Sequence, residues 1–502
     1  MNLSSLDVSV VCAYILLVFS IAIYANIFMK RVSLGRKRQK GITPIENHYL
    51  AGKTLSFWEI SLSTLAAEFS ALAFIAIPSY VYFENLNYLK FVIGACISRL
   101  IISQYFLPHI YGKGLTIFEV IAQGLKNEET SNKEQKQGKR TFAGIYLITK
   151  VIGVSLKLLG GATLISYFFD ISLFVAIMVI SMMTYLYIIL GGLKAVVRTD
   201  MVQAIVFVSG AVVAHILIGH ISQNSWFELA QFGWENGKFN PFTTSGLMSF
   251  VFGILAGLAY DAATHGVDQD LTQKLMGARN AQIAKRALRF TAILSFFVNI
   301  LFLSLGVIIW SYFTKKGVSV PNATKTFTYI IENHFPSPMK GLMIASILAA
   351  CMSTLDSSIN ALSAVFWNDI MGEHKAKYFR IYINLDNFII TISIVIVAYI
   401  FSLLPVEVNK FGSYFAYLST APLLALFLGR FSLARWITFN FSPLLVFMSF
   451  VIAFLGISLT HFRFGLNPQL SILSGIASAF LFLWIFSKVV SFLSPQKVDN
   501  ET

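Results

Sequence analysis

The sequence predicts an all-α membrane protein with about 13 transmembrane helices. Hydrophobic residues make up 56% of the 502-residue chain and charged residues only 12%, which is about half the charged share of a soluble domain. Apolar runs also recur along the whole chain, each near the roughly 20 residues that a spanning helix needs. Together these observations exclude a soluble enzyme, a disordered protein and a fibrous protein.

The first apolar run, residues 8–29, contains no charged residue. Because no basic segment precedes it and no small-residue cleavage site follows it, we expect a spanning helix rather than a signal peptide. The further spans that we expect, numbered in chain order after this one, are 57–83, 91–111, 141–167, 171–190, 201–220, 247–266, 288–313, 343–367, 381–404, 411–429, 436–459 and 470–493.

Lysine and arginine are distributed unequally over the loops between these spans. If the N-terminus lies outside, 26 of the 38 Lys and Arg residues fall in cytoplasmic segments and 8 on the opposite side. Since cytoplasmic loops of membrane proteins collect positive charge, we expect a multi-pass protein of the cell (inner or plasma) membrane with its N-terminus outside and its C-terminus inside. The same pattern explains the net charge of +14 without a nucleic-acid partner.

No loop has the features of a separate catalytic domain. The sequence contains no nucleotide-binding loop, zinc motif or nucleophile–base pair. The cysteines Cys12, Cys96 and Cys351 lie in apolar runs without metal-ligand spacing, so we interpret them as packing residues. The chain ends nine residues after the last expected span, which argues against a sensor with an attached signalling domain.

Ionisable residues inside the spans are the main functional candidates, because a charge in hydrocarbon costs several kcal/mol. Arg99 and Lys150 are expected to extend their head groups to the membrane interface, whereas Glu68 and Asp356 lie deep in their spans. The full set is Glu68, Arg99, Lys150, Lys157, Asp200, Asp261, His265, Asp268 and Asp356.

Small residues surround Glu68 in the second span, namely Ala66, Ala67, Ser70 and Ala71. They have two interpretations. One is close packing against a neighbouring helix. The other is a break in the helix whose freed carbonyl groups bind a cation, as in the discontinuous helices of transporters.

The ninth span carries a run of oxygen-bearing side chains. Ser353, Asp356 and Ser357 share one helix face, and Thr354 lies on a neighbouring face. A hydroxyl in a helix often bonds back to its own backbone, but three oxygens on one stripe, including a carboxylate, suit a hard cation. The spacing therefore favours a sodium site.

Two glycine-containing motifs interrupt other spans. Residues 191–203 (GGLKAVVRTDMVQ) are expected to form a short loop that opens the sixth span, with Asp200 at the start of its helix. In the seventh span, Gly257, Gly266 and the polar residues between them disfavour an uninterrupted helix. We therefore expect a break there that mirrors the break in the second span.

Four segments resemble the sodium/solute symporter family, which includes sodium–glucose, sodium–proline and sodium–sialate transporters. They are GGLKAVVRTDMVQ, HGVDQDLTQKLMGA (265–278), AACMSTLDSSINALSAV (349–365) and FLPHIYGKGLTIFEVI (106–121). The resemblance covers about residues 50–430 and implies a LeuT-type 5+5 inverted repeat, in which spans 2 to 6 recur upside down as spans 7 to 11.

The implied organisation has four parts. Residues 1–55 hold an extra N-terminal helix and a cytoplasmic loop, 56–221 and 246–430 hold the two five-helix repeats, and 431–502 hold two extra C-terminal helices. The breaks expected in spans 2 and 7 would then fall in the first helix of each repeat.

The resemblance also implies ligands for one sodium ion. They are the carbonyl groups of Ala66, Phe69 and Ala350 and the hydroxyl groups of Ser353 and Thr354.

Some family members, sialate transporters among them, have a second sodium site. Its counterpart here would be Asp200, Ser353, Asp356 and Ser357. Asp356 departs from the hydroxyl of those transporters. The two carboxylates would either strengthen a sodium site, or one of them would be protonated and link transport to protons.

The family places its solute cavity between spans 2, 4, 7 and 11. Lys157 lies in the span where sialate transporters have an arginine for the solute carboxylate, so it either binds an anion or pairs with a buried acid such as Glu68. Glu68 itself would tune the sodium site, contact the solute or serve as a structural acid. The candidate lining residues are Glu68, Ser70, Phe74, Lys157, Tyr260, Asp261, Thr264 and Tyr417.

The predicted function is that of a symporter that uses co-transported sodium ions to import a small organic solute by alternating access. We expect an anionic or zwitterionic solute, such as a carboxylate, amino acid or sialate. A sodium–sugar symporter and a transport-inactive membrane sensor are the alternatives. The expected partners are the solute and the lipid bilayer, with neither enzyme activity nor an obligate protein partner.

Overall fold

The computed structural model describes residues 3–35, 44–124, 132–242, 246–318, 326–371, 375–404, 418, 420–432, 443–463 and 468–493. This part of the chain is helical and contains no strand. Nine of its helical segments are long and apolar enough to cross a membrane. The prediction of a multi-pass helical protein is therefore confirmed. The count of 13 stays a prediction, because the segments Ala71–Ile110 and Leu173–Ser222 each cover parts of two predicted spans and residues 411–417 and 419 of span 411–429 lie outside the described residues.

The second predicted span is broken in the middle. Helix α3 (Phe57–Glu68) ends at the extended residue Phe69, and helix α4 (Ala71–Glu84) begins after Ser70, which is also extended. The Ser70 hydroxyl accepts a hydrogen bond from the backbone N–H of Ala73 and so caps α4. The expected break is confirmed.

The seventh span is also broken, but at a different residue from the one expected. Helix α11 (Gly246–Val267) runs through both glycines, and the break is the extended residue Asp268 before helix α12 (Gln269–Met276). Gly257 instead allows close packing, since a Cβ atom there would lie 2.1 Å from the carbonyl oxygen of Phe91 in helix α5 (Leu89–Ile101).

Spans 5 and 6 meet at two glycines rather than at a longer loop. Helix α9 (Leu173–Ser222) is non-helical only at Gly191 and Gly192, and Gly192 has φ +56°, which favours glycine. The expectation of a loop over residues 191–203 is wrong, because the helix resumes directly after Gly192 and places Asp200 two turns inside it.

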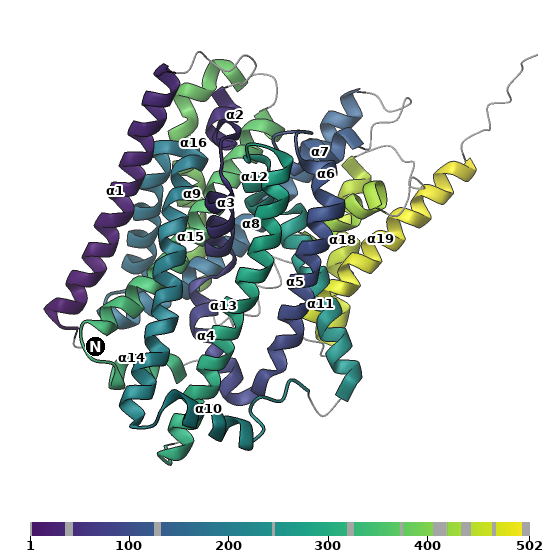
Figure 1. Ribbon diagram of the computed structural model, residues 1–502. Coiled ribbons are helices and arrows are strands. Elements are labelled where there is room, and N and C mark those ends of the chain that lie inside the picture. The colour runs from purple at the N-terminus through teal and green to yellow at the C-terminus, as the bar shows by residue number, and fades with distance from the viewer. Residues whose placement is uncertain are drawn as a thin grey trace, which may run out of the picture.

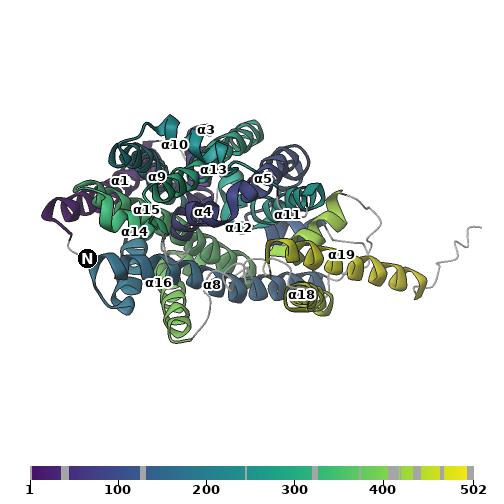
Figure 2. The ribbon, with the colours of Figure 1, turned by 90° about the horizontal axis from the view of Figure 1, so that it is seen from below.

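Helix α15 (Met339–Val365) lies at the centre of the molecule, among α9, α3, α8 (Asn132–Phe169) and α13 (Ala281–Lys315) (Figures 1 and 2). In the apolar 18-residue stretch of the segment Met339–Met371, 94% of the residues are buried. The corresponding value is 28% for the segment Ser5–Ile27 of the peripheral helix α1 (Ser5–Gly35). Helices α18 (Pro443–Ser458) and α19 (Pro468–Leu493) pack together at another edge. Side chains on every face of α15 are therefore enclosed by neighbouring helices.

Shorter helices gather at the two ends of the bundle (Figure 1). Helices α2 (Pro44–Tyr49) and α7 (Ile117–Gly124) lie at one end. Helices α10 (Trp226–Glu235) and α14 (Thr326–His334) lie at the other, together with the start of the chain, where Ser4 contacts Ser337. Helix α16 (Lys375–Ser402) packs against α8.

Candidate functional site

The oxygens predicted for the first sodium site meet where the broken second span crosses α15. The Ser353 hydroxyl donates to the carbonyl oxygen of Ala66, 2.9 Å away, and also lies 3.2 Å from the carbonyl oxygen of Ala350. The Thr354 hydroxyl donates to the same Ala350 oxygen at 3.0 Å. Phe69, the fifth predicted ligand, is the extended residue of the break. Rotation of either hydroxyl proton would turn oxygen lone pairs toward a cation.

A second buried polar cluster lies beside this group. Asp200 and Lys274 are both fully buried and form an ion pair at 2.9 Å between Oδ2 and Nζ. The Ser63 hydroxyl donates to the same carboxylate oxygen at 2.6 Å, and Lys274 Nζ also donates to the Ser63 carbonyl at 3.0 Å. The other oxygen of Asp200 is buried without a hydrogen-bond partner in the described part of the chain.

Asp356 completes this cluster from α15. It is fully buried, its Oδ2 accepts a hydrogen bond from the Tyr187 hydroxyl at 2.6 Å, and its Oδ1 accepts a long one from Ser357 at 3.3 Å. Asp356 also interacts electrostatically with Asp200. Three of the four residues predicted for a second sodium site therefore gather here, and Ser353 lies one turn away on α15.

Lys274 was missed by the sequence analysis. It lies six residues after Asp268 in the polar stretch of the seventh span, where the motif was noted but the lysine was not assigned a partner. The signal that points to it is charge balance, because a fully buried aspartate such as Asp200 needs a cation nearby.

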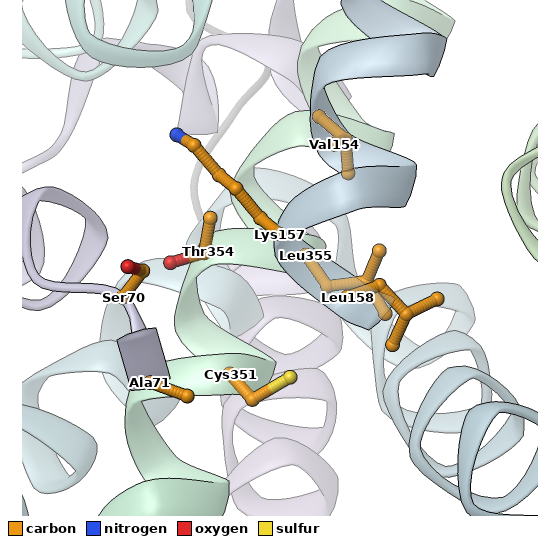
Figure 3. A pocket seen from close by; sticks show the side chains of 8 residues that line it. All are labelled: Ser70, Ala71, Val154, Lys157, Leu158, Cys351, Thr354 and Leu355. Atoms are coloured by element: carbon orange, nitrogen blue, oxygen red, sulfur yellow. The ribbon is translucent and has the colours of Figure 1, made fainter. Parts of the chain in front are cut away.

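A small cavity lies next to the first oxygen cluster (Figure 3). Its volume is about 10 Å³, room for roughly one water molecule, and its lining comes from the start of α4, from α8 and from α15. The lining residues are Ser70, Ala71, Val154, Lys157, Leu158, Cys351, Thr354 and Leu355. Thr354 therefore belongs to both the oxygen cluster and the cavity.

Lys157 is the charged residue of this cavity, and its side chain extends from α8 past Thr354 (Figure 3). Among the residues that the structure describes, it makes no ion pair and no hydrogen bond. It does not pair with Glu68, which was one of the two interpretations. An ammonium group in such a place is suited to an incoming anion.

Glu68 and Asp261, which were predicted to line the solute site, instead share Arg99 of α5. The Arg99 guanidinium lies 2.6 Å from Glu68 and 2.9 Å from Asp261. Ser295 also donates to Glu68, and His265 lies 2.9 Å from Asp261. Arg99 is only 2% exposed, so the expectation that it reaches the membrane interface is wrong, because two buried carboxylates hold it inside.

Lys150 is likewise held inside the protein rather than at the interface. It lies 2.6 Å from Asp268 and 2.9 Å from Asp270, at the break between α11 and α12. Tyr146 donates to Asp268, and Ser358 of α15 donates to Asp270, both at 2.6 Å. This network links α8, α12 and α15 next to the cavity.

The remaining predicted lining residues lie away from the cavity or outside the described residues. Phe74 packs in an aromatic cluster with Phe207, Phe302 and Phe327. Tyr260 packs against Phe91, and the Thr264 hydroxyl donates to the Tyr260 carbonyl of its own helix. Tyr417 lies outside the described residues. Of the seven that the structure describes, Ser70 and Lys157 line the cavity.

Comparison with known proteins identifies related transporters. A sodium/glucose cotransporter of Vibrio parahaemolyticus is 26% identical, with 74% of this chain and 70% of the relative aligned. The sodium/sialic acid symporter NanT of Aliivibrio fischeri is 24% identical over 66% of this chain and 65% of the relative. Human sodium-coupled monocarboxylate transporter 2 is 23% identical over 70% of this chain and 58% of the relative. The chain thus spans less than two thirds of the length of the last two.

Solved structures support the fold. A sodium-coupled sialic acid symporter, solved in a substrate-bound outward-open state, matches with a TM-score of 0.80 over 97% of this chain and 98% of that one, at 19% identity. Mhp1, a nucleobase-cation-symport-1 family transporter, matches with a TM-score of 0.60 over 90% of this chain and 96% of that one, at 12% identity.

The family model that matches the sequence is the sodium:solute symporter family, and the match covers residues 48–434. This segment contains both broken helices, the two oxygen clusters and the cavity. Since the match extends over most of the chain, the protein belongs to the sodium:solute symporter family.

Proposed function

We propose that this protein is a sodium-coupled symporter that imports a small anionic or zwitterionic organic solute by alternating access. The observation that carries the proposal is the contact between Ser353 and the carbonyl of Ala66 at a helix break, directly beside a cavity that contains Lys157. The family membership and the similarity to sodium-coupled transporters support it.

The first sodium ion would bind to oxygens from both sides of this contact. Its ligands would be the carbonyl groups of Ala66, Phe69 and Ala350 and the hydroxyl groups of Ser353 and Thr354. An ion held in this way joins the broken span to α15 and favours the arrangement in which the two lie close together. Such differential stabilisation of one conformation is what coupling requires.

The second sodium ion would bind at Asp200, Ser353, Asp356 and Ser357. The charge count supports this part of the proposal. Two fully buried carboxylates, Asp200 and Asp356, share one ammonium group, that of Lys274. One positive charge is therefore lacking, and a buried, uncompensated carboxylate is costly. A sodium ion between Asp200 and Asp356 would supply the charge.

The solute would bind in the cavity, with Lys157 as its anion contact. The N-terminus of α4 also faces the cavity at Ser70 and Ala71, and the first backbone N–H groups of a helix attract negative charge. A neutral sugar would make no use of the Lys157 ammonium group as an anion contact, so we rank sodium–sugar symport second.

The protein would lie in the cell membrane with its N-terminus outside. The unequal distribution of Lys and Arg supports this orientation. Solute and the first sodium ion would then enter from the end that carries α10 and α14 and leave at the end that carries α2 and α7.

Binding of sodium itself tests the proposal before the solute is known. We expect the purified protein to be more stable in sodium chloride than in choline chloride, because a ligand that binds only the folded state raises the melting temperature. Ser353→Ala and Thr354→Ala should each raise the sodium concentration at half-maximal stabilisation at least tenfold. Ser393→Ala is the control, since the Ser393 hydroxyl bonds only to the Ile389 carbonyl of its own helix. An equal sodium response in all four proteins would contradict the proposal.

A further inference from the structure

His265 belongs to a buried charge network that neither the proposed sodium sites nor the cavity uses. It is a residue of α11, it is only 3% exposed, and its Nδ1 atom lies 2.9 Å from Oδ1 of Asp261. The same Asp261 oxygen accepts hydrogen bonds from Nε and Nη2 of Arg99, at 3.0 and 2.9 Å. Nη2 of Arg99 also donates to Glu68 at 2.6 Å. The network therefore connects α11 through α5 to the break of the second span.

The charges of this network do not balance while His265 is neutral. Glu68 and Asp261 bring two negative charges, and Arg99 brings one positive charge. A buried carboxylate whose charge is not compensated is costly. A proton on His265 would bring the sum of the charges to zero, and histidine is the side chain that ordinarily changes its charge between about pH 5 and 8.

Three buried polar atoms of the network have no hydrogen-bond partner among the residues that the structure describes. They are Oε2 of Glu68, Oδ2 of Asp261 and Nε2 of His265. Because Nδ1 of His265 contacts a carboxylate oxygen, we assign it as the nitrogen that keeps its hydrogen. Nε2 is then the atom that takes up or releases a proton. The charged ring would keep its contact with Asp261 and add a second positive charge to the network.

The other cations around α11 do not supply the missing charge. The elements packed against α11 include α5, α12, α19 and the helical turn Ile102–Phe106. Lys90 lies at the opposite end of α5 from Arg99, Lys274 pairs with Asp200, and Lys488 is exposed. With Glu68 and Asp268, the titratable groups on these elements and on α11 itself are Lys90, Cys96, Arg99, Tyr105, Tyr260, Asp261, Asp270, Lys274 and Lys488.

The network reaches the first proposed sodium site through Glu68. Glu68 is the last residue of α3, and the next residue, Phe69, is the extended residue whose carbonyl group is a proposed sodium ligand. A sodium ion at this break would add a positive charge close to the excess negative charge of the network. Either the ion or a proton can balance that charge, so each weakens the binding of the other, as linked equilibria require.

We propose that His265 is a proton-binding site and that its proton competes with the first sodium ion. At low pH His265 is charged, the network is neutral and sodium binds weakly. At high pH His265 is neutral, the network carries one negative charge and sodium binds more tightly. Binding of sodium therefore releases a proton from Nε2 of His265. This inference rests on the proposed function, because it needs a sodium ion at the break of the second span.

Sodium titrations at two pH values test the competition, with choline chloride added to keep the ionic strength constant. The sodium concentration at half-maximal thermal stabilisation should be at least fivefold higher at about pH 5.5 than at about pH 8, since couplings between sites are ordinarily about 5- to 150-fold. His265→Gln cannot hold the proton, so most of the difference between the two pH values should disappear in this variant.

His215→Gln is the matched control. His215 is also a buried histidine, but its Nε2 atom contacts the Ser304 hydroxyl and its Nδ1 atom contacts the Ala211 carbonyl of its own helix. Neither of these partners carries a charge. His215→Gln should therefore keep the full difference between the two pH values.

Proton release gives a second readout that needs no variant, so the test remains valid if His265→Gln does not fold. In a weakly buffered solution near pH 6.5 that contains a pH-indicator dye, sodium chloride should release up to about one proton per molecule of the unsubstituted protein. Choline chloride should release none. Sodium binding without proton release would overturn the inference.

The outcomes separate this inference from the proposed function. Sodium stabilisation that is equal at both pH values overturns the competition and leaves sodium binding in place. The same holds for a pH difference that persists unchanged in His265→Gln, or that His215→Gln loses equally. The absence of sodium stabilisation at either pH overturns the proposed function itself. A pH difference that the control keeps and His265→Gln loses supports both.

Discussion

Arg99 of α5 holds two carboxylates inside the helix bundle. It contacts Glu68 beside the helix break, Asp261 of α11 and the Thr291 carbonyl of α13. These partners come from elements that are far apart in the sequence. An arginine in an apolar run either extends to the membrane interface or pairs with a buried acid. Because the acidic partners of Arg99 are distant in the sequence, the sequence alone favoured the membrane interface.

We predict that Arg99→Leu strongly destabilises the protein. Removal of the guanidinium leaves two carboxylates without their cation, and breaking a buried ion pair in this way costs about 3–5 kcal/mol. Thermal denaturation in detergent measures the effect. Arg289→Gln is the control, since exposed Arg289 contacts only Ser103 and Gln104. Equal melting temperatures for the two variants would show that Arg99 is not needed for stability.

His48 gives a pH dependence outside the membrane-spanning segments. Burial lowers the pKa of His48 to about 4, below its value of about 6.5 in an unfolded chain. Between these two pKa values the unfolded state binds more protons, so stability rises with pH across this window and falls as pH decreases from 6.5 toward 4.

We predict that His48→Asn flattens this dependence. The melting temperature of the original protein should drop from pH 6.5 to pH 4.5 by more than that of the variant. His220→Asn, at an exposed position, is the control and should leave the profile unchanged. A profile that is the same with and without His48 would count against the proposed role of its burial.

At the scale of elements, the helix breaks show what a sequence can and cannot predict. The break near Glu68 was predictable because small and polar residues cluster there, and the structure has it at Phe69 and Ser70. The break in the seventh span was expected near Gly257 and Gly266 but lies at Asp268. Glycine in a membrane helix serves packing as well as bending, and only the neighbouring helix distinguishes the two.

The candidate site was predictable to a similar degree. The oxygen stripe of α15 was apparent from its spacing, and the family resemblance assigned Ala66 as its partner, which the structure places 2.9 Å from Ser353. The neighbours of the charged residues were not predictable. Lys274 contacts Asp200 and Arg99 contacts Glu68 through tertiary packing, which periodicity does not encode.

Two glycines of α11 provide a matched test of helix packing. A Cβ atom at Gly257 would lie 2.1 Å from the backbone carbonyl oxygen of Phe91, whereas one at Gly253 would meet only the side chain of Lys90. Gly257→Ala must push α11 away from α5, and we expect a loss of at least about 1–3 kcal/mol. Gly253→Ala should have little effect, because the lysine side chain can move.

Thermal denaturation of the two glycine variants, with sodium-dependent stabilisation as a second readout, checks this prediction. Gly257→Ala should lower the melting temperature clearly more than Gly253→Ala. The reverse order would mean that α5 and α11 do not pack as the structure describes.

At the scale of the whole molecule, family membership confirms that the protein is a transporter rather than an enzyme. The charges of the proposed ions and solute determine how much net charge crosses the membrane in each transport cycle. Two sodium ions and one monoanion carry one net positive charge per cycle. At about 2.3 kcal/mol per charge per 100 mV and about 1.4 kcal/mol per tenfold ratio, that charge supports a solute gradient of roughly fortyfold before the sodium gradients are added.

We predict a ratio of one charge per solute in proteoliposomes, measured as current and solute flux together. Asp356→Asn removes the carboxylate whose charge the second sodium ion would compensate. One sodium ion would then accompany one anion, so the ratio of charge to solute should fall toward zero. Ser393→Ala is again the control. An unchanged ratio in Asp356→Asn would argue against the second sodium site.

The central position of α15 also bears on how such a protein can diversify. One helix supplies hydroxyl groups to the proposed cation ligands, a carboxylate to the buried charge cluster and one wall of the cavity. A mutation on that helix alters several tasks at once. A change of transported solute should therefore arise through substitutions on α8, where Val154, Lys157 and Leu158 line the cavity and are not among the proposed ion ligands. In a mutational scan of transport activity, α15 should tolerate the fewest substitutions, and this face of α8 should tolerate the most.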